Sequence, residues 1–119
     1  MDRSVKTETI LHEACPRLGI GLTLSKQTWE EHVKPFHAIN EEHLPLIQSV
    51  IRNTDEQQPI WRKKNQSDRM CIVKQVVNFL PDNKFILIAL KRYSEKMGCI
   101  TSIYPVDELP EKEKGYILL

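Results

Sequence analysis

The stretch from residue 60 to residue 105 most constrains the fold, because it is rich in β-branched and aromatic residues and carries turn signals at regular intervals. Its centre is the apolar run Phe85-Ile-Leu-Ile-Ala-Leu90, with Pro81-Asp-Asn before it and Ser94 to Gly98 after it. Such a run is typical of a central strand that is covered on both faces. We therefore expect four strands, at residues 60–64, 70–78, 85–93 and 99–105, arranged as an antiparallel meander.

The first half of the chain has a different pattern, because its apolar residues recur with helical spacing. This spacing predicts helices at residues 4–14, at residues 26–34 and from residues 40–45 to about 53. Ser25 is the expected N-cap of the second helix, and Pro35 predicts that this helix ends or kinks just before it. Residues 21–24 could be a brief strand or an extended lead-in. The expected fold class is α+β, with two to three N-terminal helices packed on a roughly four-stranded antiparallel sheet.

Composition indicates one soluble domain over residues 1–119. Hydrophobic residues make up 40% and charged residues 28%, which is ordinary for a globular protein. The longest apolar run is too short to span a bilayer and the N-terminus lacks a signal-peptide pattern, so we expect a cytoplasmic protein. The three cysteines show no C-x-x-C spacing, which argues against a disulfide framework or a zinc site. We expect no metal and no cofactor.

Charge is distributed unevenly along the chain. Residues 1–60 carry 6 Lys/Arg and 9 Asp/Glu, residues 61–97 carry 9 and 3, and residues 98–119 carry 2 and 4. The three parts therefore have net charges of −3, +6 and −2. A basic middle part could hold a phosphate backbone, since Lys and Arg supply most of the affinity for nucleic acids. The alternative is a solvated strand face without a ligand.

Two separated segments carry side chains that suit phosphate chemistry. The first is Trp29-Glu-Glu-His32-Val-Lys-Pro-Phe-His37, which places two imidazoles near the end of the second expected helix. The second is Ile100-Thr-Ser-Ile-Tyr104-Pro, which places hydroxyl groups on the fourth expected strand. Regular alternation sends Ser102 and Tyr104 to one face of the sheet and Thr101 to the other, although an irregularity in the strand would exchange the two.

These segments and their order resemble the BECR superfamily of small RNases, the fold of barnase, EndoU, the tRNase colicins and RelE-like toxins, and in particular its phage-associated nuclease branch. The resemblance covers about residues 22–106 and rests on Leu24-Ser25, the two histidines, a Lys-bearing strand and the Thr-Ser-Ile-Tyr-Pro sequence. It implies a metal-independent endoribonuclease, a toxin or phage or mobile-element effector that cleaves tRNA or mRNA. The partners it implies are RNA and a cognate antitoxin or immunity protein, and such an effector could be delivered into a target cell.

Cleavage of this kind uses the ribose 2′-OH as nucleophile and leaves a 2′,3′-cyclic phosphate. His32 and His37 are the expected general acid and base, because histidine changes its charge near neutral pH. Lys74, Ser102 and Tyr104 would surround the phosphate as donors. The expected RNA-binding residues are Trp61, Arg62, Lys63, Lys64, Arg69 and Thr101.

A second interpretation is a catalytically inactive module on the same fold that binds nucleic acid or a host protein. The two interpretations differ in geometry. An enzyme should place His32 or His37 within about 7 Å of Tyr104 or Ser102 across an open groove. A metal-dependent nuclease is a third interpretation, but it would need clustered carboxylates that the expected strands do not provide.

Overall fold

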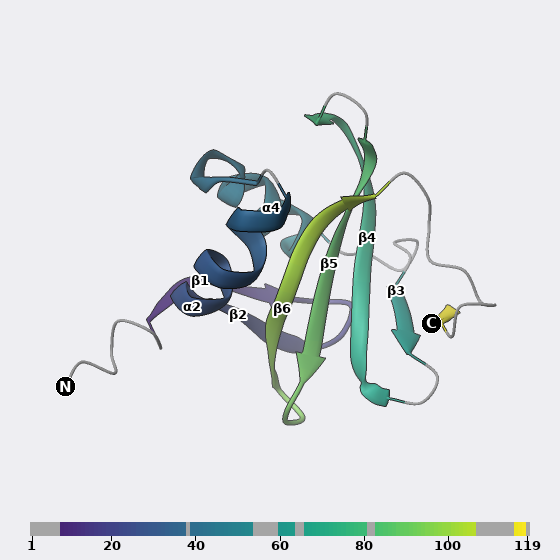
Figure 1. Ribbon diagram of the computed structural model, residues 1–119. Coiled ribbons are helices and arrows are strands. Elements are labelled where there is room, and N and C mark those ends of the chain that lie inside the picture. The colour runs from purple at the N-terminus through teal and green to yellow at the C-terminus, as the bar shows by residue number, and fades with distance from the viewer. Residues whose placement is uncertain are drawn as a thin grey trace.

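The computed structural model describes the backbone of residues 8–37, 39–53, 60–63, 66–80, 83–106 and 116–118. The described strands form one seven-stranded sheet in the order β1-β2-β6-β5-β4-β3-β7 (Figure 1). Their bounds are β1 Thr9–Cys15, β2 Ile20–Ser25, β3 Ile60–Lys63, β4 Gln66–Leu80, β5 Asn83–Arg92, β6 Met97–Val106 and β7 Tyr116–Leu118. The pairing of β2 with β6 is parallel and the other described pairings are antiparallel, so the sheet is mixed.

An N-terminal hairpin takes the place of the first expected helix. The expectation of a helix at residues 4–14 is wrong for the described part of that range, because β1 pairs antiparallel with β2. Gly19 lies in the turn between the two strands with φ of 67°, a left-handed conformation that glycine adopts without strain. The strand reading of residues 21–24 is confirmed by β2.

The helical part lies between β2 and β3 and consists of two short runs. The first run comprises α2 Lys26–Thr28, η1 Trp29–Val33 and α3 Lys34–His37, and the second comprises η2 Glu41–His43 and α4 Leu44–Arg52. The expected architecture of two to three N-terminal helices on a four-stranded antiparallel sheet is therefore wrong. The chain begins its described part with strands, and the four strands expected after residue 60 are only part of a larger mixed sheet.

The first helical run continues past Pro35 because its turn widens there. The backbone N–H of Lys34 donates to the carbonyl of Trp29, five residues earlier, so η1 is a π-helical segment. Proline has no N–H to donate and its ring crowds the preceding turn, which normally ends or kinks a helix. A π turn re-routes the local hydrogen bonds, and the helix extends to His37 instead of ending before Pro35.

The helices cover one face of the sheet and bury the main hydrophobic core. Trp29, Val33 and residues of α4 pack with the inward-facing residues of β1, β2, β5 and β6. Trp29 is only 3% exposed and its Nε1 donates to Glu41 at 3.4 Å. The Lys34 ammonium lies 2.6 Å from the same carboxylate and holds the pKa of Glu41 below its usual value. Trp29 is therefore a core residue that connects the two helical runs and is not free to stack on a nucleobase.

The opposite side of the sheet, called the outer face below, carries a second and smaller apolar cluster. Its buried members are Cys71, Val73 and Leu87, and partly buried residues pack against them: Trp61, Phe85, Ala89, Tyr104 and Val106. All helical segments lie on the other side of the long strands β4, β5 and β6 (Figure 1). Within the described ranges no helix is long and apolar enough to cross a membrane.

Candidate functional site

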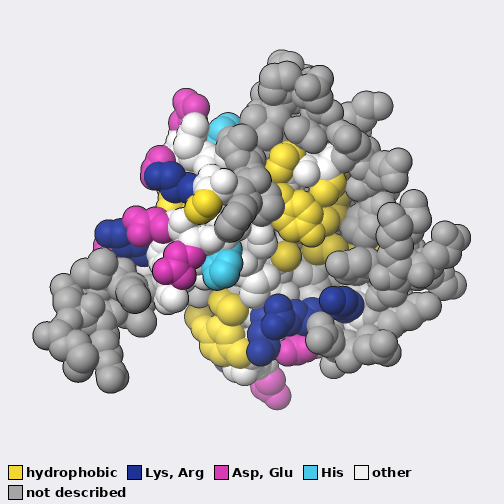
Figure 2. Space-filling model, viewed as in Figure 1, with side chains coloured by type: hydrophobic (Ala, Val, Ile, Leu, Met, Phe, Trp, Pro, Cys, Tyr) yellow, Lys and Arg dark blue, Asp and Glu magenta, His cyan; other side chains and the backbone are white. Residues whose placement is uncertain are grey.

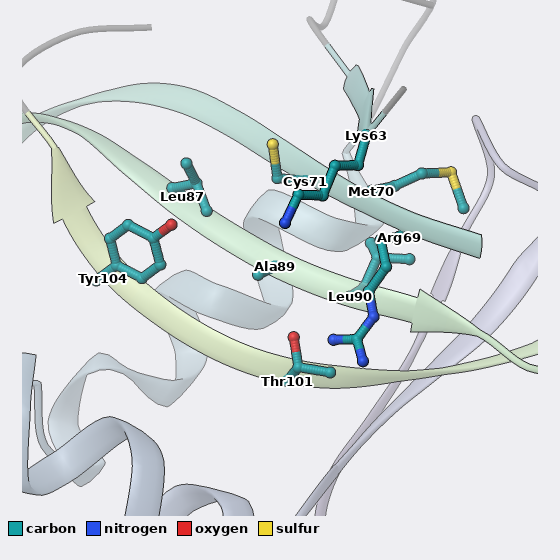
Figure 3. A pocket seen from close by; sticks show the side chains of 9 residues that line it. All are labelled: Lys63, Arg69, Met70, Cys71, Leu87, Ala89, Leu90, Thr101 and Tyr104. Atoms are coloured by element: carbon teal, nitrogen blue, oxygen red, sulfur yellow. The ribbon is translucent and has the colours of Figure 1, made fainter. Parts of the chain in front are cut away.

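An open pocket of about 140 Å³ lies on the outer face. It is lined by Lys63, Arg69, Met70, Cys71, Leu87, Ala89, Leu90, Thr101 and Tyr104, from the four adjacent strands β3, β4, β5 and β6 (Figure 3). The side chains of its floor are apolar, and its rim carries two cations and two hydroxyl groups. None of the described lining residues is a carboxylate. The pocket is thus suited to a ligand with negative charge or exposed acceptor atoms.

A β-bulge in β6 places Thr101 at this pocket. Ser102 pairs with Ala89 and Ile100 pairs with Leu90, so Thr101 is an extra residue without a cross-strand partner. Ile100 and Ile103 both face the core, although they are three residues apart and regular alternation would separate them. The expectation from alternation that Thr101 faces away from Tyr104 is therefore wrong. Both side chains lie in front of the sheet, with the helices behind it (Figure 3).

The two cations of the rim come from neighbouring strands and reach the pocket from the same side. The Arg69 guanidinium extends across β5 toward Thr101, and the Lys63 amine lies over the part of the floor made by Cys71 (Figure 3). Lys63 is exposed and Arg69 is half-buried. A guanidinium and an ammonium at one opening attract phosphate or carboxylate groups, and the half-buried position of Arg69 lowers the entropy lost on binding.

The floor stays apolar at neutral pH because the thiol of Cys71 stays protonated. Burial raises the pKa of Cys71 to about 12, and the backbone hydrogen bond with Trp61 offsets only part of that effect. Leu87 and Ala89 of β5 complete the floor. A free anion would therefore be held at the rim, because the floor has no charged side chain to neutralise it.

Lys91 extends the positive surface of the outer face beyond the pocket rim. Lys91 is the cross-strand partner of Arg69, and its ammonium lies 4.0 Å from the Asp68 carboxylate. Both groups of that pair are more than 40% exposed, so the pair is weak and leaves Lys91 able to meet a ligand. On the side seen in Figure 2, some of the Lys and Arg side chains form a band that borders hydrophobic surface and acidic side chains, whereas others lie apart among acidic side chains.

The structure brings together four residues that the sequence singled out. Lys63 and Arg69 were expected to bind RNA, as was Thr101, and Tyr104 was expected at the phosphate; all four line the pocket. Trp61 belongs to the adjoining apolar cluster, and its Nε1 is buried without a hydrogen-bond partner. The partly exposed side chain of Trp61 can therefore offer ring surface to a ligand but not its N–H group.

The other expected RNA-binding residues do not join the pocket. Arg62 pairs with the core residue Met70, so its side chain lies on the helix side of the sheet, and its Nε is buried without a partner. It is therefore separated from Lys63 by the sheet. Lys64 lies outside the described residues.

Of the expected catalytic residues whose side chains are described, Tyr104 is the one that lines the pocket. Lys74 pairs with Ile86 of the main core, which places Lys74 on the helix side, opposite Tyr104. The register places Ser102 beside Ala89, but Ser102 does not line the pocket. His32 is exposed on η1 and is not among the lining residues either. His37 ends α3, and its side chain lies outside the described part of the structure.

Sequence reasoning missed the residues of the pocket floor. Cys71 was considered only as a thiol, and Leu87 and Ala89 belong to a strand that was expected to be covered on both faces. The signal that could have found them is Ala89 itself, a small residue between the larger Ile88 and Leu90, because a small side chain in a central strand leaves space above the sheet. Among the described residues no three His, Cys, Asp or Glu side chains gather in a way that could hold a metal ion.

Fold and site together define a protein built mostly of one mixed sheet, with two short helical runs on one face and a basic, partly apolar pocket on the other. Comparison of the chain with protein-family profiles, with curated proteins and with solved structures found no significant match.

Proposed function

We propose that the protein binds a strand of RNA on the outer face of its sheet, and that it does so as a binding module. The observation that carries the proposal is the pocket rim, where Lys63 and Arg69 stand beside the hydroxyl groups of Thr101 and Tyr104. Phosphate oxygens accept hydrogen bonds from all four kinds of group. The net charge of the chain is only +1, so attraction of a polyanion depends on where cations gather, as Lys63, Arg69 and Lys91 do on the outer face.

The apolar part of the outer face supports a nucleic acid over a simple anion. Trp61, Phe85 and Tyr104 are only partly buried beside the cationic rim. Proteins that bind single strands combine cations for the backbone with aromatic rings for the bases. A protein partner with an acidic surface would also be attracted by the cations, and the experiment below separates these outcomes.

RNA cleavage stays a prediction from the sequence resemblance. The fold that the resemblance implied is not the observed one, and neither Lys74 nor His32 lines the pocket. The described geometry therefore offers the phosphate cations and hydroxyl groups but no imidazole, and an efficient general acid and base for the 2′-OH reaction is absent from the described lining. Binding is the function that the pocket supports best.

The test measures binding of a fluorescein-labelled 15-nucleotide RNA of mixed sequence by fluorescence anisotropy, over a range of salt concentrations. Arg69→Ala and Lys63→Ala should each weaken binding and lower the slope of log K against log salt by about one, as expected for the loss of one phosphate contact. Lys34→Ala is the matched control, since it removes the same charge from an exposed pair on the helix side. Lys34→Ala should leave the slope of log K against log salt close to that of the wild type.

Two results would overturn the proposal. One is the absence of RNA binding by the wild-type protein at low salt, and the other is equal weakening by Lys34→Ala and Arg69→Ala. The same RNA, recovered after incubation in EDTA, reports on cleavage. Intact RNA supports a binding module, whereas fragments with a 2′,3′-cyclic phosphate that disappear with His32→Ala would replace it by the endoribonuclease.

A further inference from the structure

We propose that the pocket accepts one pyrimidine ring of a single-stranded RNA, so that the protein prefers uridine-rich or cytidine-rich strands to adenosine-rich ones. This inference rests on the proposed RNA binding and specifies which part of the RNA enters the pocket. It starts from the difference between the rim and the floor. The rim can hold phosphate, whereas the floor is formed by Cys71, Leu87 and Ala89 and offers only apolar surface.

The size of the pocket matches a single six-membered ring. Its volume of about 140 Å³ is close to that of an apolar cavity of about 150 Å³ that accommodates one benzene molecule. A pyrimidine base is of this size, whereas a purine has a second fused ring that would extend out of the pocket. An apolar floor favours a flat ring over a phosphate group, because burying an ion there would cost several times more than the burial of a ring would gain.

The rim suits the polar edge of a pyrimidine. Lys63 and Arg69 can only donate hydrogen bonds, and the hydroxyl groups of Thr101 and Tyr104 can donate or accept. Uracil presents two carbonyl oxygens that accept hydrogen bonds, and cytosine presents one carbonyl oxygen and a ring nitrogen. The Arg69 guanidinium and the Thr101 hydroxyl lie on the same side of the pocket (Figure 3), so one base edge can meet both groups.

Single-stranded RNA is the form that can deliver such a ring. In an A-form helix the bases are stacked and paired, and their edges are not free to enter a pocket on a protein surface. The pocket lies on the outer face of the sheet, and the partly buried rings of Trp61 and Phe85 pack against the same apolar cluster that supplies Cys71 and Leu87 to its floor. Neighbouring bases of the same strand can stack there while their phosphates meet Lys91 and Arg69.

The experiment compares labelled 15-nucleotide oligo(U), oligo(C) and oligo(A) in the anisotropy assay, and repeats oligo(U) after annealing to oligo(A). Oligo(U) and oligo(C) should bind about tenfold tighter than oligo(A), since one well-stacked base changes an affinity by roughly that factor. The duplex should bind more weakly than either free pyrimidine strand. Equal binding of the three single strands would overturn the pyrimidine pocket and leave RNA binding standing, whereas no binding of any strand would overturn both proposals.

A variant that fills the pocket separates the ring site from the cationic rim. Ala89→Leu adds an apolar side chain to the floor and should reduce the preference for oligo(U) over oligo(A) to less than twofold, about the level of purely electrostatic binding. Ala14→Leu is the matched control on the edge strand β1, where Ala14 is exposed, and it should keep the tenfold preference. Thr101→Val, which exchanges the hydroxyl group for a methyl group, should lower the affinity for oligo(U) more than the affinity for oligo(A). Retention of the full preference by Ala89→Leu, in protein whose circular dichroism matches the wild type, would overturn the inference.

Discussion

Deletion of Thr101 should leave the fold intact, because this residue is the bulge of β6. The consecutive residues Ala89 and Leu90 of β5 pair with Ser102 and Ile100 of β6, so the pairing skips Thr101. Without Thr101 these pairs can stay as they are, and β6 becomes a regular strand. The buried residues Ile100 and Ile103 would then be two residues apart and would still share the core face.

The loss of stability on deletion depends on which buried side chains the deletion moves. Deleting Thr101 moves no buried apolar side chain, so we expect a loss of about 1 kcal/mol, as for an ordinary substitution. Deleting Ala89 from β5 is the control, because β5 is paired on both sides and a one-residue shift there exchanges its two faces. In the smallest rearrangement, Leu90 takes the position of Ala89 on the outer face and Lys91 takes the position of Leu90 in the core. Exposure of one leucine costs about 1.5 to 3 kcal/mol, and burial of an unpaired ammonium adds several more.

Urea unfolding measures both deletions, with tryptophan fluorescence as the signal, to which the buried Trp29 and the partly buried Trp61 contribute. With a slope of about 1.5 kcal/mol per M, the midpoint should fall by about 0.7 M for the Thr101 deletion and by 3 M or more for the Ala89 deletion. The second value approaches the whole stability of a small domain. Similar losses for the two deletions would refute the assignment of Thr101 as the extra residue of the bulge.

Three further predictions concern stability and thiol chemistry. Gly98→Ala should destabilise the protein by about 1 to 3 kcal/mol, because its Cβ would lie 3.0 Å from the carbonyl oxygen of Lys91; urea midpoints measure this, and an unchanged midpoint would contradict the close approach. The raised pKa of Cys71 means that its thiol ionises first in the unfolded chain, so stability should fall as the pH rises from 9.0 towards 12. Cys71→Ala should remove that part of the fall, and an identical pH dependence in the variant would contradict it. At pH 8 the partly exposed Cys99 should react with iodoacetamide while Cys71 stays unmodified until urea is added, which peptide mass spectrometry can check.

The strands after residue 60 could be predicted because their signals are local. Runs of β-branched and aromatic residues, such as that around Ile88, favour strands, and Asx, Pro and Gly residues favour the turns between them. The first described strand was mistaken for a helix, because Ile10, Leu11 and Ala14 fit a helical spacing. Its partner β2 is anchored by pairing with β6, and such non-local pairing overrides a local pattern.

The candidate site could be predicted only in part, because alternation is a weak guide where a strand is irregular. The basic residues were recognised from local charge. Which face of the sheet each side chain lies on depends on the register, and the register places Arg62 and Lys74 on the face opposite to that of Lys63. The bulge does have a signal in the sequence. Ile100 and Ile103 are three residues apart in a strand, and two large apolar residues at that spacing can share the core face only if one residue between them is extra.

The parallel pairing of β2 with β6 has a consequence for how the chain reaches its native state during synthesis. Gly21 pairs with Met97, more than seventy residues later in the chain. Domains emerge from the ribosome with the N-terminus first, so the hairpin of β1 and β2 cannot join β6 until Met97 to Cys99 have been synthesised. Pairings so far apart in sequence also make folding slow. During synthesis the edge of β2 therefore stays unpaired until β6 is made. A nascent chain that stalls before β6 would be open to association with other chains or to proteolysis.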